Sequence, residues 1–250
     1  MKYIREIFGR IWAVWAIIVF VGTMFIFFIP FLLFCYFLPE PKRTHRFIWM
    51  SRFWMNTFLG LIGCPLTKRG LEHFKDGRSY IVLCNHNSFL DIPVSSPAIP
   101  GGNKTIAKSE MAKIPLFNLI YKAGSVLVDR KSDASRKQSY MEMKKVLAMG
   151  LHMCIYPEGT RNKTKAPLKS FHSGAFRLAM DTQTPIMPAV IFNTRKALPA
   201  SKTMYLIPHP LEIHFLKPID PRDFQSMDEL RERVHKIMSE YYSGKRNTEN

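Results

Sequence analysis

An uncharged stretch near the N-terminus constrains the fold of this chain most strongly. No charged residue occurs from Ile11 to Pro39, a run of 29 residues of which 18 are Leu, Ile, Val or Phe. A soluble core helix is usually amphipathic, and the apolar region of a signal peptide has about 7–15 residues, so neither explanation fits this run. We therefore predict an apolar, membrane-embedded helix over residues 11–39.

The residues that follow predict a second, amphipathic helix at the membrane surface. Residues 47–62 are rich in aromatic and aliphatic side chains and are interrupted by Arg52. Basic residues lie on both sides of the apolar run, so the positive-inside rule gives it no clear orientation. We favour a helical hairpin that dips into one leaflet, with both ends cytoplasmic, over a single span. This anchor would occupy residues 1–63 and hold the rest of the chain on the cytoplasmic face of the membrane.

After residue 63 the pattern changes to short apolar runs that alternate with amphipathic stretches. We expect strands at Tyr80–Cys84, Thr105–Ala107, Val126–Val128, Met153–Tyr156, Ile186–Phe192 and within Met204–Leu216, and helices at Ala134–Met149, Gly174–Asp181 and Met227–Tyr241. The alternation predicts an α/β fold with a largely parallel central sheet flanked by helices. This domain would cover residues 64–243 and leave a disordered tail at 244–250.

The chain is strongly basic. It has 36 Lys and Arg against 19 Asp and Glu, for a formal charge of +17. Such an excess indicates an anionic partner, which could be nucleic acid, an anionic membrane face or a phosphorylated substrate. Binders of single-stranded nucleic acid interleave basic and aromatic residues, whereas the aromatic residues here concentrate in the N-terminal segment. We therefore expect no nucleic-acid partner.

The first polar motif directly follows a predicted strand, at the end where α/β proteins bind their ligands. It reads Asn-His-Asn-Ser-Phe-Leu-Asp and contains His86 and Asp91. A helix would set these two side chains roughly 140° apart, and a strand would point them to opposite faces, so they can meet only across a turn. An Asp carboxylate that reaches an imidazole fixes its tautomer and makes it a general base. On its own, however, this spacing is more often a helix cap beside a loop histidine.

Three further blocks follow in order. Gly124–Arg130 ends in an Asp-Arg pair, which in isolation is typical of a surface ion pair. Tyr156–Arg161 reads Tyr-Pro-Glu-Gly-Thr-Arg; its glycine permits close approach to the backbone, and the planar fork of its arginine matches phosphate. Alone, that hexapeptide could be an ordinary turn. Ile186–Val190 is an apolar strand with one proline.

Together and in this order, the four blocks resemble the glycerolipid acyltransferase family, in particular its 1-acyl-sn-glycerol-3-phosphate acyltransferases. That family has the same ordered pattern of N-H-x₄-D, G-x₄-D-R, a P-E-G-T-R turn and a proline-bearing apolar strand. The resemblance runs from about Ser79 to Phe192. It departs from the family pattern at Pro188-Ala189, where the family usually has Pro-Val.

The resemblance implies that His86 is the general base for the acceptor hydroxyl and that Asp91 orients it. It also implies a group of residues that hold the acceptor phosphate or shape its pocket: Lys108, Arg130, Glu158, Gly159, Thr160 and Arg161. It implies no acyl-enzyme, no metal and no cofactor. The expected partners are acyl-CoA or acyl carrier protein as donor, lysophosphatidic acid as acceptor, and membrane lipid. The expected product is phosphatidic acid, in phospholipid biosynthesis.

The residues leave alternatives open. The acceptor could instead be glycerol-3-phosphate or another lysophospholipid. A hydrolase is disfavoured because the G-x-S-x-G and H-E-x-x-H motifs are both missing from the sequence. A non-enzymatic membrane protein that binds anionic lipid is the remaining alternative from a different class.

Overall fold

The computed structural model describes residues 2–115, 117–129, 131–164 and 166–248. Within these residues, seven strands form one sheet in the order β1-β7-β6-β2-β5-β3-β4. The strands are β1 (Leu66–Arg69), β2 (Ile81–Cys84), β3 (Asn103–Lys108), β4 (Ser125–Val128), β5 (His152–Ile155), β6 (Ile186–Phe192) and β7 (Leu211–Phe215). Among the strand pairs of this sheet, β6–β7 is antiparallel and the other five are parallel, which confirms the predicted largely parallel sheet.

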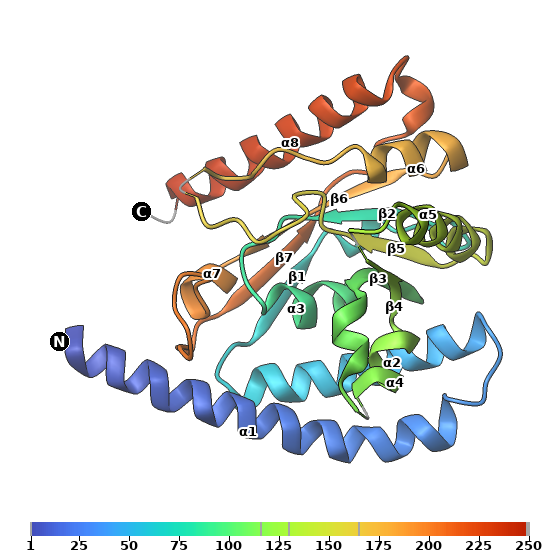
Figure 1. The fold of residues 1–250 in the computed structure, drawn as a ribbon. Coiled ribbons are helices and arrows are strands. Elements are labelled where there is room, and N and C mark those ends of the chain that lie inside the picture. The colour runs from blue at the N-terminus through green and yellow to red at the C-terminus, as the bar shows by residue number, and fades with distance from the viewer. Residues whose placement is uncertain (1, 116, 130, 165, 249–250) are drawn as a thin grey trace.

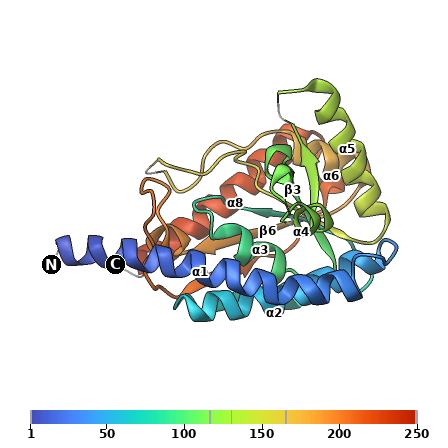
Figure 2. The same cartoon turned by 60° about the horizontal axis from the view of Figure 1, so that its bottom comes forward.

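Helices cover both faces of the sheet (Figure 1). The α-helices are α1 (Lys2–Phe34), α2 (Lys42–Leu61), α3 (Asp91–Ala98), α4 (Phe117–Ala123), α5 (Asp133–Ala148), α6 (Gly174–Thr182), α7 (Thr194–Ala197) and α8 (Met227–Thr248). Short 3₁₀ turns lie at Leu71–His73, Ser109–Lys113 and Pro221–Asp223. One apolar cluster joins the sheet to α5, α6 and α8, and a second joins its other face to α2, α3 and α4 (Figure 2). α1 lies outermost on that second face (Figure 1).

The central strands are apolar along their whole length because both of their faces are covered. β2 and β6 are neighbours in the sheet, and every residue of both is buried. The proline of the fourth sequence block, Pro188, lies inside β6, and its carbonyl accepts a hydrogen bond from the Leu216 N–H (2.8 Å). This block therefore builds the sheet.

The two N-terminal helices differ in extent from the sequence-based expectation. α1 runs over Lys2–Phe34 instead of residues 11–39, and α2 runs over Lys42–Leu61 instead of residues 47–62. Hydropathy marks the part of a helix that suits lipid, whereas the backbone hydrogen bonds continue through flanking Lys and Arg, which are good helix formers. The predicted bounds were therefore wrong, although both helices exist.

The C-terminal helix is longer than predicted. α8 continues to Thr248, so the expectation of a disordered tail from residue 244 was wrong as far as that residue. Lys245 forms an ion pair with Glu212 at the start of β7, and its ammonium stands over the ring of Phe192 (4.8 Å). These tertiary contacts hold the last turns of the helix, and local sequence carries no sign of them.

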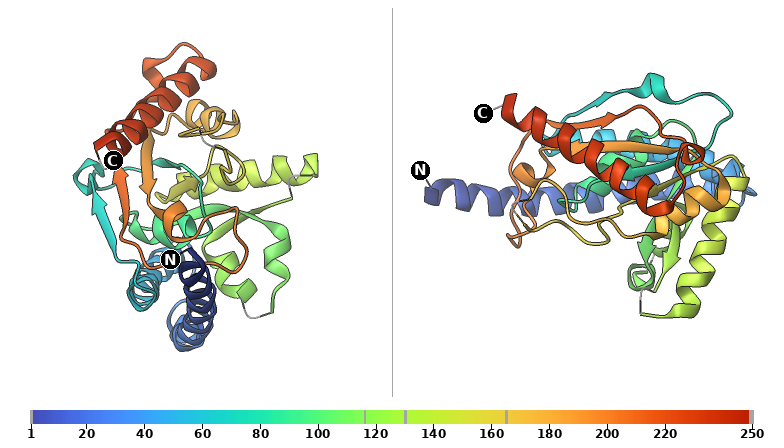
Figure 3. Two further views of the ribbon diagram at one scale, coloured as in Figure 1. Left: turned by 90° about the vertical axis from the view of Figure 1, so that its left-hand side faces the viewer. Right: turned by 90° about the horizontal axis from the view of Figure 1, so that it is seen from above.

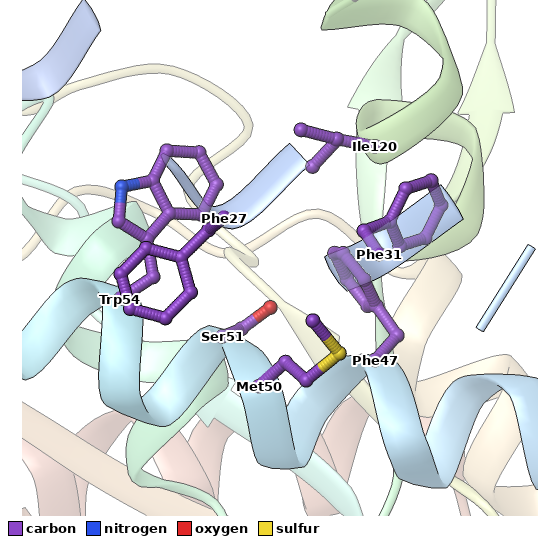
Figure 4. Close-up of a pocket in the computed structure, with 7 residues that line it drawn as sticks. All are labelled: Phe27, Phe31, Phe47, Met50, Ser51, Trp54 and Ile120. Carbon is purple, nitrogen blue, oxygen red and sulfur yellow. The ribbon is translucent and has the colours of Figure 1, made fainter. Parts of the chain in front are cut away.

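α1 and α2 lie side by side as an antiparallel hairpin along one face of the molecule (Figures 1 and 3). The Trp12 indole N–H donates to the Ile62 carbonyl (2.9 Å), and that of Trp54 donates to the Thr23 hydroxyl (2.9 Å). A narrow cavity between this hairpin and α4 is lined by Phe27, Phe31, Phe47, Met50, Ser51, Trp54 and Ile120 (Figure 4). Because α2 packs directly on the sheet domain, the division of the chain into an anchor at residues 1–63 and a domain from residue 64 stays a prediction.

Arg52 of α2 fastens the hairpin to α3. Its guanidinium donates to the carbonyls of Pro97 (3.1 Å), Ile99 (2.6 Å) and Gly101 (2.9 Å). The last carbonyls of a helix have no partner inside the helix, so an arginine at this place stabilises its C-terminal end. The residue that interrupts the amphipathic pattern of α2 is therefore a contact between the two parts of the chain.

The outward face of α1 is apolar and exposed to the surroundings. Large exposed side chains occur along its whole length, from Ile4 to Leu33. Among the residues that the structure describes, α1 is the one helix that is long and apolar enough to cross a membrane. An apolar surface of this extent on a water-soluble protein would be unusual. These features support a membrane anchor formed by the N-terminal segment.

Candidate active site

The sequence motifs meet at one edge of the sheet. β2, β5, β3 and β4 run parallel, so their carboxyl ends lie at the same edge. His86 follows β2, the turn that contains Glu158 and Arg161 follows β5, and Lys108 ends β3. This edge is where open α/β sheets bind ligands.

Asp91 holds the imidazole of His86 across the turn between β2 and α3. Its Oδ2 atom accepts hydrogen bonds from His86 Nδ1 (2.8 Å) and from the backbone N–H groups of Asn87 (2.6 Å) and Ser88 (2.7 Å). Its Oδ1 atom accepts one from the Thr194 hydroxyl (2.6 Å). The carboxylate is fully buried and only accepts, so Nδ1 carries the proton and Nε2 is the basic nitrogen of His86.

The Glu158 carboxylate clamps the backbone of the same turn. Oε1 accepts from the His86 N–H (2.7 Å), and Oε2 accepts from the Lys169 N–H (2.9 Å). The His86 carbonyl in turn accepts from the Asn162 N–H (2.6 Å). Glu158 is 1% exposed, and its burial raises the pKa of its carboxyl group. In this structure Glu158 therefore joins two loops and positions His86, and neither of its oxygens faces an open pocket.

Tyr156 supports one face of the His86 ring. The Tyr156 and His86 rings stack with centroids 4.4 Å apart and planes inclined by 28°. The Tyr156 hydroxyl shares a hydrogen bond with Ser95 Oγ on α3 (2.6 Å), and burial raises the pKa of the phenol, which keeps it neutral. Neither Tyr156 nor Thr194 was predicted from the sequence as a site residue. The only signal for Tyr156 was its place directly before the Pro-Glu-Gly-Thr-Arg turn.

Arg161 lies at the outer rim of the site. Its guanidinium carbon stands 3.7 Å from the centre of the Phe89 ring, and Phe89 belongs to the His86 turn. The structure thus brings the first and third sequence motifs together through a cation–π contact. A partly exposed guanidinium held in this way keeps its planar fork available for an anion.

The structure also gives a reason for the other residue types in the Tyr156–Arg161 turn. Gly159 has φ +69°, and a Cβ there would come within 2.7 Å of the His172 ring, so both conformation and space require glycine. The exposed Thr160 hydroxyl accepts a hydrogen bond from Lys169 Nζ (2.6 Å). Lys169 is therefore a further cation beside Arg161, and its position eleven residues after Glu158 gave no signal in the sequence.

Lys108, another predicted phosphate ligand, does not lie beside His86. Lys108 is exposed at the end of β3, and β5 separates β3 from β2, so its strand lies about 10 Å from the strand that leads to His86. Its side chain is long enough to reach inward from there, but it does not contact the imidazole in this structure. Arg130 lies outside the described residues.

This arrangement defines a class of protein: an α/β fold in which a buried Asp orients a His beside an exposed edge that carries an Arg. The chain belongs to the Acyltransferase family, whose sequence profile matches residues 65–192. It is 34% identical over 167 residues to the protein named 1-acyl-sn-glycerol-3-phosphate acyltransferase from Cocos nucifera, a match that covers 66% of this chain and 53% of the relative. It is also 34% identical over 133 residues to 1-acyl-sn-glycerol-3-phosphate acyltransferase alpha from Homo sapiens, covering 52% and 47%.

The chain thus spans about half the length of these curated relatives. A solved structure shares the whole architecture. The crystal structure of the 1-acyl-sn-glycerophosphate acyltransferase PlsC from Thermotoga maritima superposes with a TM-score of 0.79 over 98% of each chain, at 24% sequence identity. At that identity the likeness establishes the fold alone, and it confirms the predicted fold class.

Proposed function

We propose that this protein transfers a fatty acyl group from an acyl thioester to the sn-2 hydroxyl of 1-acyl-sn-glycerol-3-phosphate, giving phosphatidic acid. The observation that carries the proposal is the His86–Asp91 pair (2.8 Å), held at the ligand-binding edge of the sheet beside Arg161. The names of the relatives support this acceptor, and membership of the family supports the reaction class.

The chemistry follows from the free nitrogen of His86. Nε2 removes the proton of the acceptor hydroxyl as its oxygen attacks the thioester carbonyl carbon. The C–O bond forms, the C–S bond breaks, and the departing thiolate takes the proton back from the imidazolium. Asp91 stabilises the imidazolium between these two steps, because its buried carboxylate contacts Nδ1 throughout. The products are the ester and a free thiol, and no acyl-enzyme is needed.

The rim supplies recognition of the acceptor phosphate. Arg161 offers a bidentate fork, and Lys108, at the end of β3, and Arg130 are proposed to add charge. The formal charge of +17 suits a phosphorylated acceptor and an anionic donor such as acyl-CoA or acyl carrier protein. Both donors present the same thioester, so the proposed chemistry is common to them.

The anchor is proposed to lie in one leaflet, with the catalytic domain on the cytoplasmic face. α2 contacts α3, β3 and α4, so the sheet domain covers the hairpin along much of its length. A hairpin that crossed the bilayer would have to draw this domain into the lipid. An in-plane hairpin instead leaves the exposed apolar face of α1 in the lipid and the domain in water.

An acceptor panel tests the proposal. The purified full-length protein in detergent is given acyl-CoA or acyl carrier protein thioester together with lysophosphatidic acid, glycerol-3-phosphate or lysophosphatidylcholine, and free thiol is measured. We expect rapid thiol release with lysophosphatidic acid, and the His86→Ala variant serves as the blank. A preference for glycerol-3-phosphate or lysophosphatidylcholine would overturn the acceptor, and no release with any acceptor would favour a non-enzymatic lipid binder.

A further inference from the structure

The corner between α1 and α2 carries a binding feature that the proposed reaction does not use. A surface hollow of ≈ 470 Å³ lies there, a volume in the usual range of ligand sites. It is lined by Leu38, Lys42, His45, Arg46 and Trp49. The corner is on the amino side of the sheet, because Glu40 in the same turn pairs with Lys104 near the start of β3 (2.9 Å). His86 and Arg161 follow the carboxyl ends of their strands, so the hollow is separate from the candidate active site.

Three basic side chains share one face of α2 at this corner. Lys42, His45 and Arg46 are spaced at i, i+3 and i+4, which places them next to one another on a helix. All three are exposed. In the part of the chain that the structure describes, Lys42 and Arg46 form no ion pair and no side-chain hydrogen bond, so their charge is not neutralised within the protein.

The carboxylate nearest in sequence to these cations is that of Glu40, and it already accepts hydrogen bonds from other residues. Glu40 Oε1 accepts from Arg43 (2.8 Å) and Lys104 (2.9 Å), and Oε2 accepts from the Thr44 hydroxyl (2.6 Å). Burial alone would raise the pKa of Glu40, but these bonds outweigh it and hold the pKa at about 2. Glu40 therefore does not neutralise Lys42 and Arg46. These two cations of the hollow stay available to an external anion.

The walls of the hollow are continuous with the surface that the anchor places in lipid. Leu38 lines it from the turn, next to Phe37, which is 86% exposed. Trp49 lines it from α2 and is 52% exposed. Tryptophan prefers the boundary between lipid tails and water, and lysine and arginine reach from that boundary toward phosphate. A phosphate in the hollow would thus have apolar protein surface beside it for attached acyl chains.

We propose that this corner binds the headgroup phosphate of an anionic membrane phospholipid, at a site distinct from the catalytic one. Lys42 and Arg46 contact the phosphate, and Leu38 and Trp49 contact the first part of the acyl chains. Basic clusters on membrane-surface helices recognise anionic lipids through the same chemistry. The ligand is a lipid and not free phosphate, because two of the five lining residues, Leu38 and Trp49, are apolar and adjoin the exposed face of α1.

Native mass spectrometry of the full-length protein in a non-ionic detergent tests the site. Phosphatidylserine and phosphatidylcholine of equal chain length are titrated in competition, since neither has the free sn-2 hydroxyl of the proposed acceptor. The wild type should retain phosphatidylserine preferentially. Loss of two interfacial charges in Lys42→Gln/Arg46→Gln should reduce that preference by roughly 25-fold, at about 1 kcal/mol per charge.

The matched control removes the same charge elsewhere. Arg233→Gln/Lys236→Gln changes two exposed cations of α8, which packs on the opposite face of the sheet. It should keep the wild-type preference, and an equal loss in both double variants would overturn the site in favour of bulk attraction. Displacement of the lipid by millimolar inorganic phosphate would show a free-phosphate site and would also overturn the proposal.

The outcome is independent of the reaction. Lys42 and Arg46 lie outside the catalytic edge, so Lys42→Gln/Arg46→Gln should consume thioester in detergent within about twofold of the wild type. Failure of the proposed function would appear as missing thioester consumption in the wild type, with the lipid preference unchanged. Failure of the lipid site would appear as equal retention of the two lipids, with normal turnover.

Discussion

The turn that carries His86 and the rim that carries Arg161 differ in how the protein holds them. Around the turn, Asp91 receives four hydrogen bonds, Glu158 ties the backbone, and Tyr156 covers the ring. Arg161 has an aromatic face beneath it, and its partner in the proposed reaction is the acceptor phosphate. The proposed proton-transfer group is thus fixed before substrate arrives, whereas the proposed phosphate-binding group would complete its contacts with the ligand.

The largest expected effect comes from removing the fixed base. His86→Ala should lower kcat by roughly 10²–10⁴-fold, because a positioned general base contributes that much. Thiol release under saturating substrates measures the loss, and an unchanged thermal unfolding midpoint shows that the fold is intact. Retention of more than about a tenth of the wild-type rate would exclude His86 as the base.

Asp91→Asn should have the next largest effect, a loss in kcat of roughly 10²-fold or more. An amide cannot accept from all the donors that converge on Asp91, and it can impose the wrong tautomer on His86. The acceptor KM should change little, because Asp91 is buried and does not touch substrate. A variant with wild-type kcat and a raised acceptor KM would instead place Asp91 in binding.

Substitutions of Arg161 test the rim, the second of the two compared regions. Arg161→Ala should raise the acceptor KM by roughly 10- to 150-fold, which corresponds to one charge-assisted hydrogen-bonding pair. Arg161→Lys should recover only part of this, because an ammonium keeps the charge and loses the fork. The thioester KM should stay constant. Steady-state kinetics in which the thioester KM rises and the acceptor KM does not would move Arg161 to the donor side.

The smallest expected effect is at the ring that supports His86. Tyr156→Leu should lower kcat about two- to twelvefold, since an aromatic stack is worth about 0.5–1.5 kcal/mol. Tyr156→Phe keeps the stack and should keep most of kcat, but it leaves the buried Ser95 hydroxyl without its partner and should lower the unfolding midpoint. Equal kcat in the two variants would show that stacking does not matter to the base.

The same contrast explains what the sequence could predict. β2, β5 and β6 were predictable because burial on both faces requires continuous apolar runs. β1 was missed because this edge strand reads Leu-Thr-Lys-Arg, and α3 was missed because it contains prolines at 93 and 97. Local pattern carries no signal for an edge strand of this composition.

In the candidate site, local motifs predicted the His86–Asp91 contact but not the residues that support it. His86 and Asp91 are five residues apart, so a turn argument reached them. Thr194 meets Asp91 from a position 103 residues away, and Glu158 meets His86 from 72 residues away. Such partners are fixed by the topology of the sheet, which a single sequence does not reveal. Glu158 was therefore expected in the phosphate pocket, although its carboxylate serves the backbone.

The contact of Arg52 with α3 gives the N-terminal segment a second role, which is to support the helix that begins with Asp91. α3 has eight residues and is about 12 Å long, with Asp91 at its first position and the carbonyls bound by Arg52 at and just beyond its last turn. It is a short rigid link between the N-terminal hairpin and the Asp91 carboxylate. A protein that lacks residues 1–63 would lose the Arg52 contact that supports α3, together with its proposed membrane anchor. Supplying the acceptor as a water-dispersed lipid would therefore not restore its activity.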